Sequence, residues 1–383
     1  MKKILLFLLL VVPALLWAGV TGKLAGTVVD AQSGEPLPGA NIQLVGTSLG
    51  TVCDVYGKYV ILNVPPGVTS VKITYIGYES QVITDVRIMV DLTTTLNSRL
   101  KPSTVTLKEM VIVADKPMIQ RDITSSGSTM RRDEIDGLPV TDFTQVLSLQ
   151  AGVPEQNGVL HIRGGRSNAV GFMIDGMYVQ DPLLGNMITQ INNDAIQEMS
   201  LLSGTFNAEY GNALSGIVNI VTRDGGDTHT GNIEYRTSTV GVDRYSQLAQ
   251  DRVNGSFGGP LFTTRLKYFL SAEQNKKGSY LPFGNDRQLT LFNKLSYRLS
   301  SNMKATLTNR RTRSRYQNYS HDYKYIPDQY LKHRTDSWQS MAMNNHTLSP
   351  NLFYDLPVSY FDEKYYTGVD KDTSPYLSTT ERE

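Results

Sequence analysis

The stretch from Leu160 to Gly226 constrains the fold most strongly, because short apolar runs alternate there with glycines and helical periodicity is almost absent. Residues 217 to 222 carry apolar side chains on both faces of an extended chain, which is typical of a strand buried on both sides. Gly204, Gly211 and Gly216 precede this run and predict tight turns where backbone passes close to backbone. The stretch therefore predicts strands in the interior of a domain.

Three motifs follow one another in this stretch: LHIRGG, FMIDGMYV and AEYGNALSGIVNIVTRDGG. Their order and spacing resemble the plug domain of TonB-dependent outer-membrane receptors. The resemblance implies structural roles for Arg163, Gly164, Gly165, Asp175, Gly176, Tyr210, Gly211, Gly216 and Asn219. For Arg163 we expect an arginine buried in the plug or paired with an acidic barrel residue, and the alternative is a binding residue that faces the channel.

The N-terminus and the composition indicate an exported protein. Met1 to Gly19 begins with two lysines, continues through an apolar run and ends in small residues, which predicts a signal peptide, with an uncleaved anchor as the alternative. The chain of 383 residues has 37 basic and 36 acidic side chains, so its net charge indicates no polyanionic partner. The single cysteine, Cys53, excludes an internal disulfide framework, and we expect it to be buried and unreactive.

Residues 20 to 108 contain short runs rich in Val, Ile, Thr and Tyr, separated by turn clusters, which predicts a small β-sandwich. GTVVDAQSGEPLPGANIQLVGT and ITYIGYES resemble the carboxypeptidase-regulatory-like domain, a transthyretin-like sandwich without catalytic residues of its own. Ser48 formally satisfies the G-x-S-x-G pattern of serine hydrolases. That pattern requires a strand before the serine and a helix after it, whereas β-prone residues surround Ser48, so we interpret it as a turn serine.

A short β-prone segment follows the sandwich and consists of Glu109, Met110, Val111, Ile112, Val113 and Ala114. Its position resembles that of the TonB box, the extended peptide that the periplasmic protein TonB captures. Such capture works by strand addition, so an accessible extended backbone matters more than side-chain identity. The alternative is that Met110 to Val113 is the last strand of the sandwich. Gln120 to Ser128 would then be a flexible tether.

Within the predicted plug, Thr141 is expected to cap a short helix whose Phe143, Val146 and Leu147 lie on one side. The loop Asp181 to Asn186 is expected to reach toward the external face. The acidic residues that open the second half of the plug, such as Glu198, show no spacing that indicates catalysis. We expect them to face solvent or to contact the barrel wall.

After Gly226 the pattern becomes that of membrane-spanning β-strands, and 15 of the 21 tyrosines lie in this part. Gln288 to Ser300 alternates Leu and Tyr with Thr, Lys, Ser and Arg, and Asn302 to Asn309 alternates in the same way. A short turn joins these two strands, whereas Asn275 to Arg287 is predicted to be a long polar loop. Short turns at one end and long loops at the other are typical of outer-membrane barrels.

The cluster of arginines and tyrosines from Arg310 to Tyr319 is expected to continue a strand out of the membrane, and nucleic-acid binding is not expected of an exported protein. The 157 residues after the plug are too few for the 22 strands of the family's barrel. We therefore expect the sequence to be the N-terminal part of a longer protein.

The predicted fold is mainly β: a transthyretin/Ig-like β-sandwich, an α+β plug domain and antiparallel transmembrane β-barrel strands that form an incomplete barrel. The predicted boundaries are 1–19 for the signal peptide, 20–108 for the sandwich, 109–128 for the TonB-box-like segment and tether, 129–226 for the plug and 227–383 for the partial barrel.

The resemblance implies a receptor that takes up a scarce glycan, siderophore or peptide with energy from TonB, located in the outer membrane of a Gram-negative-type bacterium. No catalytic residue, cofactor or metal is expected, because no H-E-x-x-H, P-loop or G-x-G-x-x-G motif occurs. Expected partners are TonB, outer-membrane lipid, the substrate and a substrate-binding surface lipoprotein. The alternatives are a surface or periplasmic binding or adhesion protein without transport, and a hydrolase that uses Ser48.

Overall fold

The computed structural model describes residues 21–47, 49–89, 93–103, 109–113, 126–140, 142–156, 159–180, 187, 190–204, 213–238, 250–279, 281, 284–300, 302–326, 329–349 and 352–369. The predicted signal peptide, Ser48, Ala114, Thr141 and the loop 181–186 lie outside these residues, as do Tyr210 and Gly211. The described chain forms a β-sandwich, a plug and a long curved sheet, so the predicted order of fold types is confirmed.

The sandwich consists of two sheets with separate strand orders. One sheet has the order β4-β1-β7 with β8 also paired to β1, and the other has the order β3-β2-β5-β6-β9. The strands are β1 (Gly22–Asp30), β2 (Asn41–Leu44), β3 (Gly50–Val52), β4 (Lys58–Val64), β5 (Gly67–Thr74), β6 (Ser80–Ile88), β7 (Thr93–Thr95), β8 (Ser98–Leu100) and β9 (Glu109–Val113). The sandwich sheet therefore includes residues beyond the predicted boundary at 108.

The sandwich encloses its own apolar core, to which Leu24, Ile42 and Val71 contribute fully buried side chains. Cys53 joins this core and is 5% exposed, so its predicted burial is confirmed. Burial, and next the charge of Asp54, raise the pKa of the Cys53 thiol to about 11. Because the thiolate is the reactive form, we expect this thiol to react slowly at neutral pH.

The plug is built on a five-stranded sheet with the order β10-β15-β16-β13-β14. These strands are β10 (Ser126–Arg131), β13 (Val170–Ile174), β14 (Met177–Tyr178), β15 (Ile196–Ser203) and β16 (Gly216–Thr222), and the hairpin of β11 (Glu155–Gln156) and β12 (Val159–Leu160) lies apart from them. Every residue of β16 is buried, as its two apolar faces predict. Ser126 to Ser128 pair with β15, so the prediction that they belong to a flexible tether is wrong.

Two short helices and three 3-10 turns complete the described elements. They are α2 (Arg132–Asp136), α3 (Phe143–Ser148), η2 (Ser167–Ala169), η3 (Asn193–Ala195) and η5 (His321–Tyr323). Helix α3 buries Phe143, Val146 and Leu147 as predicted. Its N-cap is Asp142, whose side chain accepts from the Thr144 amide, so the assignment of the cap to Thr141 is wrong by one residue. In the described part of the chain, no helix is both long enough and apolar enough to cross a membrane.

The third unit is a seven-stranded antiparallel sheet in which each strand pairs with the next along the chain. Its strands are β17 (Thr230–Thr237), β18 (Gln250–Leu261), β19 (Thr263–Gly278), β20 (Asn285–Ser300), β21 (Met303–Gln317), β22 (Lys332–Ser349) and β23 (Leu352–Gly368). The long polar loop predicted for Asn275 to Arg287 is wrong at both ends, because Asn275 to Gly278 continue β19 and pair with Asn285 to Gln288 of β20.

Side chains alternate across this sheet. Lys294, Ser296 and Thr308 are buried on the face toward the plug, whereas Leu291 and Leu307 are exposed on the other face. The exposed outer face also carries Phe257, Leu270, Tyr297, Trp338, Leu356, Val358 and Tyr360. An apolar outer face and a polar inner face are the pattern of a sheet that faces lipid on one side.

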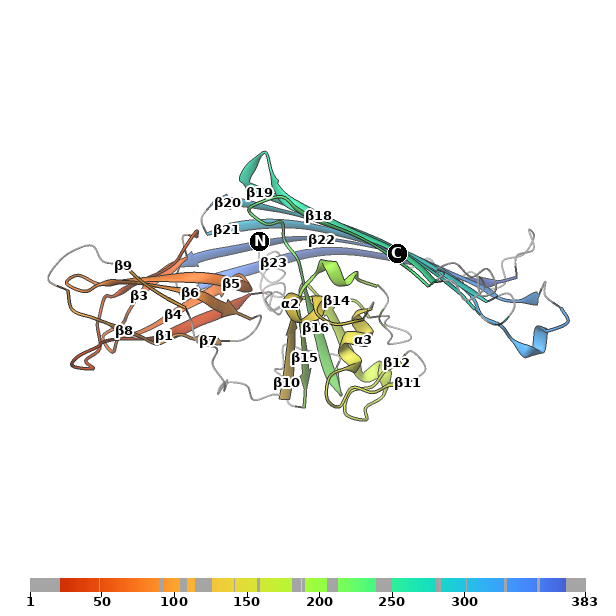
Figure 1. Ribbon diagram of the computed structural model, residues 1–383, viewed down its shortest axis with the longest axis horizontal. Coiled ribbons are helices and arrows are strands. Elements are labelled where there is room, and N and C mark those ends of the chain that lie inside the picture. Colours follow the sequence, from red (N-terminus) through yellow and green to blue (C-terminus); the bar gives the residue numbers. More distant parts are fainter. Residues whose placement is uncertain are drawn as a thin grey trace, which may run out of the picture.

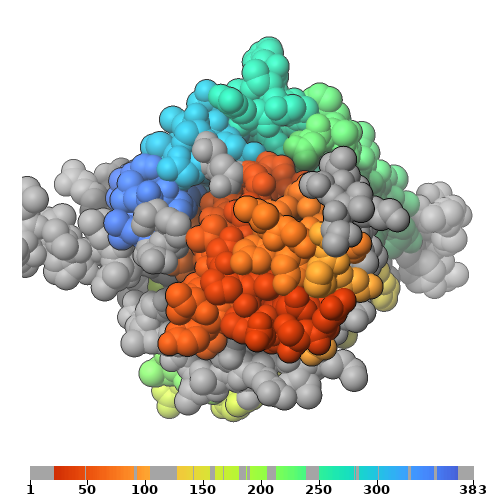
Figure 2. All heavy atoms as spheres, turned by 90° about the vertical axis from the view of Figure 1, so that its left-hand side faces the viewer, coloured from red at the N-terminus to blue at the C-terminus, as the bar shows by residue number. Residues whose placement is uncertain are grey.

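The three units have distinct places (Figure 1). The plug lies under the concave face of the curved sheet, and the sandwich lies at one end of that sheet. Seen from that end, the sandwich covers the middle of the molecule (Figure 2). At this end β18 and β19 are separated by Phe262 alone, and β20 and β21 by residues 301–302, whereas residues 318–331 separate β21 from β22 at the other end. The predicted asymmetry of short turns and long loops is confirmed.

Candidate functional site

The inner face of the curved sheet meets the plug mainly through polar side chains. Two phenylalanines of the sheet, Phe269 and Phe292, pack into the plug's apolar core, and the Arg223 guanidinium lies 5.1 Å from the centre of the Phe269 ring. The seven-stranded curved sheet is called the wall below. Every second residue of each of its strands faces inward, and most of the remaining inward-facing residues at this contact carry hydroxyl, amide or charged groups. The contact between plug and wall is therefore the candidate functional site.

Lys294 is the central cation of this site. It projects from β20 and is 9% exposed, and its Nζ donates to the Thr222 carbonyl oxygen at 3.1 Å and to the Thr222 hydroxyl at 3.0 Å. The same Nζ lies 3.7 Å from an oxygen of Asp175 and 3.6 Å from an oxygen of Asp224. One wall lysine thus binds the end of plug strand β16 and two plug carboxylates.

Asp224 is held by the wall from several sides. It accepts from Ser296 Oγ at 2.7 Å and forms an ion pair with Lys304 on the neighbouring strand β21. Burial alone would raise the pKa of the Asp224 carboxyl. The charges of Lys294 and Lys304 and the hydrogen bonds from Lys304 and Ser296 outweigh burial and hold this pKa below its usual range. Asp224 therefore stays ionised and attached to the wall at any pH near neutral.

A second polar contact lies at the start of β15. Asn192 donates to Asn254 on β18 and to Ser271 Oγ on β19, the latter at 2.8 Å. Asn254 in turn donates to Asp194 at 2.9 Å. The expectation that acidic residues of the second half of the plug contact the wall holds for Asp194. Glu198 is buried, so of the two expected positions it does not have the one that faces solvent.

Several buried polar atoms at this contact have no hydrogen-bond partner among the described residues. They include Nε and Nη1 of Arg310, Oε1 of Gln339 and the Thr308 hydroxyl, all on the inner face of β21 and β22. Unpaired buried groups cost free energy, which a permanently packed interface avoids.

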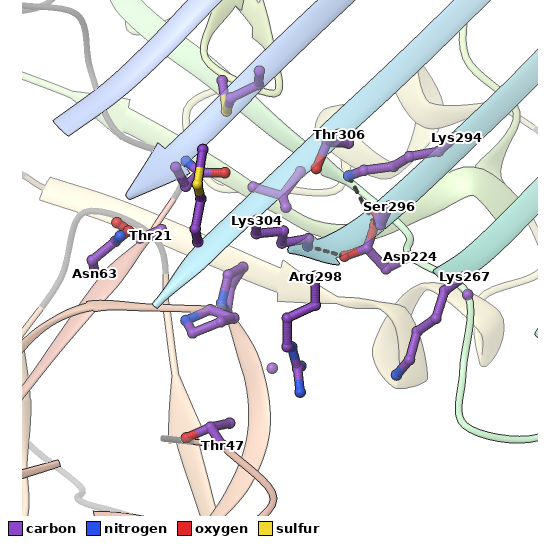
Figure 3. Close-up of a pocket in the computed structure, with 18 of the residues that line it drawn as sticks. Thr21, Thr47, Asn63, Asp224, Lys267, Lys294, Ser296, Arg298, Lys304 and Thr306 are labelled. Atoms are coloured by element: carbon purple, nitrogen blue, oxygen red, sulfur yellow. Dashed lines mark hydrogen bonds and ion pairs between the residues drawn. The ribbon is translucent and has the colours of Figure 1, made fainter. Parts of the chain in front are cut away.

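A cavity of about 470 Å³ opens where plug, wall and sandwich meet. Its lining includes Asn63 and Val68 of the sandwich, Asp224 of the plug, and Arg298 and Lys304 of the wall. Figure 3 shows Lys304 directed at Asp224, while Arg298 and Lys267 extend into the space below them. Direct contacts also join sandwich and wall, since Asn63 Nδ2 donates to Thr347 Oγ1 at 3.1 Å and Arg298 Nη1 to the Gly46 carbonyl at 3.4 Å.

The structure separates the predicted plug residues into two groups. Asp175, Gly176 and Asn219 lie in or beside the central sheet near the wall, and Asp175 accepts from the Thr222 amide at 2.8 Å. A side chain at Gly216 would lie 2.9 Å from Ile162 and 3.0 Å from the Leu202 carbonyl, so only glycine fits there without a shift. Arg163, Gly164 and Gly165 instead form a turn away from β20, and Gly165 packs on Ser215.

Arg163 is exposed and has a φ of +49°, so the expectation of a buried arginine is wrong. Its amide donates to the Gly152 carbonyl at 2.8 Å, which fixes the turn through the backbone rather than through the guanidinium. The guanidinium lies beside Gly204, where an added Cβ would be 3.2 Å from its Nη1.

The segment predicted to bind TonB lies at the edge of a sheet. Glu109 to Val113 form β9, which pairs in parallel with β6 of the sandwich. This position agrees with the alternative interpretation of a last sandwich strand. An edge strand also presents one unpaired row of backbone donors and acceptors, so the prediction of TonB capture is compatible with it and stays a prediction.

The wall residues Lys294, Lys304 and Asn254 and the plug residue Asp224 were not singled out from the sequence as site residues. The alternation in β20 and β21 places both lysines on the inner face, and this signal alone could have marked them as wall contacts. Lys294 lies 72 residues from its plug partner Thr222, and Lys304 lies 80 residues from Asp224, so the pairing itself required the fold. Among the described residues, no group of three or more His, Cys, Asp or Glu side chains is arranged to hold a metal ion.

Comparisons with known families match the first two units. The family model of the CarboxypepD_reg-like domain matches residues 24–112, and that of the TonB-dependent receptor plug domain matches residues 119–217. The chain is 24% identical over 283 residues to the TonB-dependent transporter Oar of Myxococcus xanthus, covering 65% of this chain and 26% of that protein. It is 26% identical over 245 residues to the TonB-dependent receptor SusC of Bacteroides thetaiotaomicron, covering 58% and 24%. The chain thus spans about a quarter of the length of these relatives.

Solved structures share the fold. The siderophore receptor PirA of Pseudomonas aeruginosa superposes with a TM-score of 0.51 at 20% identity, covering 63% of this chain and 41% of that chain. The alcaligin outer-membrane receptor FauA of Bordetella pertussis gives a TM-score of 0.52 at 17% identity, covering 65% and 41%.

Proposed function

The chain belongs to the TonB-dependent receptors, and from this premise we propose that it serves uptake across an outer membrane through an opening that its plug closes. The observation that carries the proposal is the sheet with an apolar outer face and a polar inner face that holds the plug. The opening is controlled by the position of the plug, and no covalent chemistry is involved. The substrate is a scarce glycan, siderophore or peptide.

The contacts of the plug suit a gate. Lys294 and Lys304 hold Asp175 and Asp224 by ion pairs, and Asn254 holds Asn192 and Asp194 by hydrogen bonds. Each of these groups is one that water solvates well, so the contacts can be exchanged for water when the plug moves. A continuous apolar contact would instead resist separation in proportion to its area.

The orientation follows from the connections between strands. The turns beside the sandwich are short, which in outer-membrane barrels is the periplasmic side, and the longer connections face the cell exterior. We propose that the sandwich and the segment 109–114 therefore lie in the periplasm, where TonB can reach them, and that Met1 to Gly19 is removed on export. A surface lipoprotein that delivers substrate would bind at the opposite side.

We propose that TonB captures Glu109 to Ala114 as an added strand. Residues 115–125 connect the segment to β10, so a pulling force applied to the segment would be transmitted to β10 and from it to β15 and β16. Displacement of β16 would draw Thr222 and Asp224 away from Lys294, which opens the wall contacts one after another.

A pull-down with the periplasmic domain of TonB tests this capture. Replacing residues 109–114 by a Gly-Ser sequence of equal length is expected to abolish binding, because a flexible chain must lose more conformational entropy to become an extended strand. The matched control replaces residues 115–120 in the same way and should bind TonB like the unchanged chain. Equal binding by both variants would contradict the assignment of residues 109–114 as the TonB-binding segment. A measurement of uptake in cells would then distinguish transport from a binding or adhesion role.

A further inference from the structure

We infer that the cavity between sandwich, plug and wall is a binding site for a small carboxylate that also carries hydroxyl groups, such as a short oligosaccharide of uronic acids. The inference rests on the proposed function in one respect only: the ligand would reach this periplasmic cavity as a transported substrate. The cavity measures about 470 Å³, within the range of about 300 to 1,000 Å³ that is usual for small-molecule sites.

The charges that line the cavity are unequal. Its described lining contains the cations Arg265, Lys267, Lys294, Arg298 and Lys304, and the carboxylates Asp175 and Asp224. The two inner lysines are used by these carboxylates, and Lys267 forms an ion pair with Asp227 at 2.6 Å. Arg298 Nη1 donates to the Gly46 carbonyl at 3.4 Å, and neither Arg298 nor Arg265 lies within ion-pair distance of a carboxylate in the described part of the chain.

These two arginines line the cavity near the ends of the strands that carry them, and both are exposed. Arg298 follows Lys294 and Ser296 on the inner face of β20, and Arg265 precedes Lys267 and Phe269 on the inner face of β19. Figure 3 shows Arg298 extending into the cavity below the pair of Lys304 and Asp224. Guanidinium groups bind carboxylates through two parallel hydrogen bonds, so two of them on one wall favour an anionic ligand.

The remaining polar lining favours hydroxyl groups on the same ligand. Asn63 is 8% exposed and belongs to the lining of the cavity, and its Nδ2 donates to Thr347 Oγ1. Amide and hydroxyl groups in a lining can exchange hydrogen bonds with the hydroxyl groups of a ligand, which a simple anion does not provide. Thr21, Thr47, Thr264 and Ser300 add further hydroxyls to the lining.

The three units all contribute to this cavity, which makes it sensitive to the plug. Asp224 occupies its inner wall while it is bound to Lys294 and Lys304. When the plug moves, these two lysines lose their carboxylate and become available to the ligand. The cavity would then bind the same anion more tightly than when the plug is seated.

Calorimetric titration of the purified chain in detergent with digalacturonate tests the site, with methyl-esterified digalacturonate as the uncharged ligand of similar shape. We expect binding of the acid and at least about tenfold weaker binding of the ester, because the ester lacks the charge that strengthens hydrogen bonds from guanidinium groups. Arg298→Gln should weaken binding of the acid by a similar factor. Asp224→Asn should strengthen it.

The matched control is Arg287→Gln, which changes the same residue type on the same strand but on the outer face at the opposite end, and it should leave binding unchanged. Slow reaction of Cys53 with Ellman's reagent verifies that each variant keeps a folded sandwich. Absence of binding to the unchanged chain, equal binding of acid and ester, or unchanged binding by Arg298→Gln would each overturn the inference. Inorganic phosphate that binds as tightly as digalacturonate would overturn the role of the hydroxyl groups. TonB takes no part in this titration. Its result therefore tests the binding site even if the transport proposal fails.

Discussion

At the scale of single residues, Lys294 is the wall side chain that contacts three plug residues. It is buried, and it contacts Thr222, Asp175 and Asp224 at once. Removing one partner of a buried ion pair leaves the other charge without compensation, which costs more than the pair itself contributes. Replacing only Lys294 or only one of its carboxylate partners is therefore expected to destabilise the seated plug.

We predict that Lys294→Gln destabilises the seated plug by about 3 kcal/mol, as expected for a broken buried pair. Asp175→Asn in the same chain should recover part of this loss, because the uncompensated charge is removed. Asn tolerates the positive φ of 50° at position 175, so this substitution adds little backbone strain. A double-mutant cycle on denaturant unfolding of the plug measures the coupling, and strictly additive effects would show that the two residues do not interact.

A second residue-scale feature lies in the sandwich, where the Tyr78 hydroxyl donates to Asp30 Oδ2 at 2.6 Å. This hydrogen bond, together with those from the amides of Ser33 and Gln32, lowers the pKa of Asp30 from its ordinary value of 3.8. A carboxyl whose pKa is lower in the folded state stabilises the fold above its unfolded pKa. That stability is lost as the pH falls through the lower, folded pKa.

The sandwich should therefore lose stability below about pH 4, the unfolded pKa of an aspartate. Asp30→Asn should be less stable than the unchanged chain at pH 7, and its stability should depend less on pH between 5 and 2. Urea unfolding followed by circular dichroism at several pH values, compared between the two chains, provides the measurement. An identical dependence on pH in both would show that another carboxyl is responsible.

At the scale of elements, the chain leaves β16 through two glycines that differ in their surroundings. A Cβ added at Gly225 would lie 2.4 Å from the Tyr268 carbonyl oxygen and 2.8 Å from that of Gly259, both in the backbone of the wall. At Gly226 the nearest atom would be the Thr228 carbonyl oxygen at 3.3 Å, within the same loop. Only the first glycine is required for the plug to approach the wall closely.

We expect Gly225→Ala to push the end of β16 away from β19 and to cost about 1 to 3 kcal/mol, the usual penalty of overpacking. Gly226→Ala is the neighbouring control and should cost less than half as much. Protease sensitivity of the plug in otherwise folded protein distinguishes the two. Equal sensitivity would mean that the loop can move without disturbing the seated plug.

At the scale of the whole molecule, strand register aligns the outer face into a band. Tyr268, Leu295, Leu307, Ala342 and Val358 are successive register partners across five strands. All five belong to the face opposite the plug. Such a row is expected to lie near the middle of the apolar layer.

Leu307→Arg is predicted to destabilise the folded sheet in lipid by about 2 to 4 kcal/mol, the cost of an arginine at the bilayer midplane. Ser314→Arg on the same strand points to the inner face and should cost much less. The fraction of folded protein across a urea series in lipid bilayers, read from heat-dependent mobility on gels, gives both values. A similar loss in both variants would show that the outer face does not meet lipid at Leu307.

Much of the architecture followed from local sequence patterns. Period-two alternation identified the inner and outer faces of β20 and β21, and doubly apolar composition identified β16 as buried, because both signals depend only on neighbouring residues. Ends of elements were less accurate. The polar residues Asn275 to Gly278 continue β19, since pairing with β20 satisfies their backbone whatever their side chains.

The sequence by itself determined the kinds of units, their order and the faces of their strands, since these depend on periodicity and turn chemistry along a few residues. Only the tertiary structure decided which groups meet: that Lys294 binds Asp175 and Asp224, that Arg163 is exposed while Asp175 is buried, and that three units enclose one cavity. The physical reason is that these contacts join residues up to about 280 positions apart, as with Asn63 and Thr347. Their formation depends on how the folded units pack, which no local pattern records.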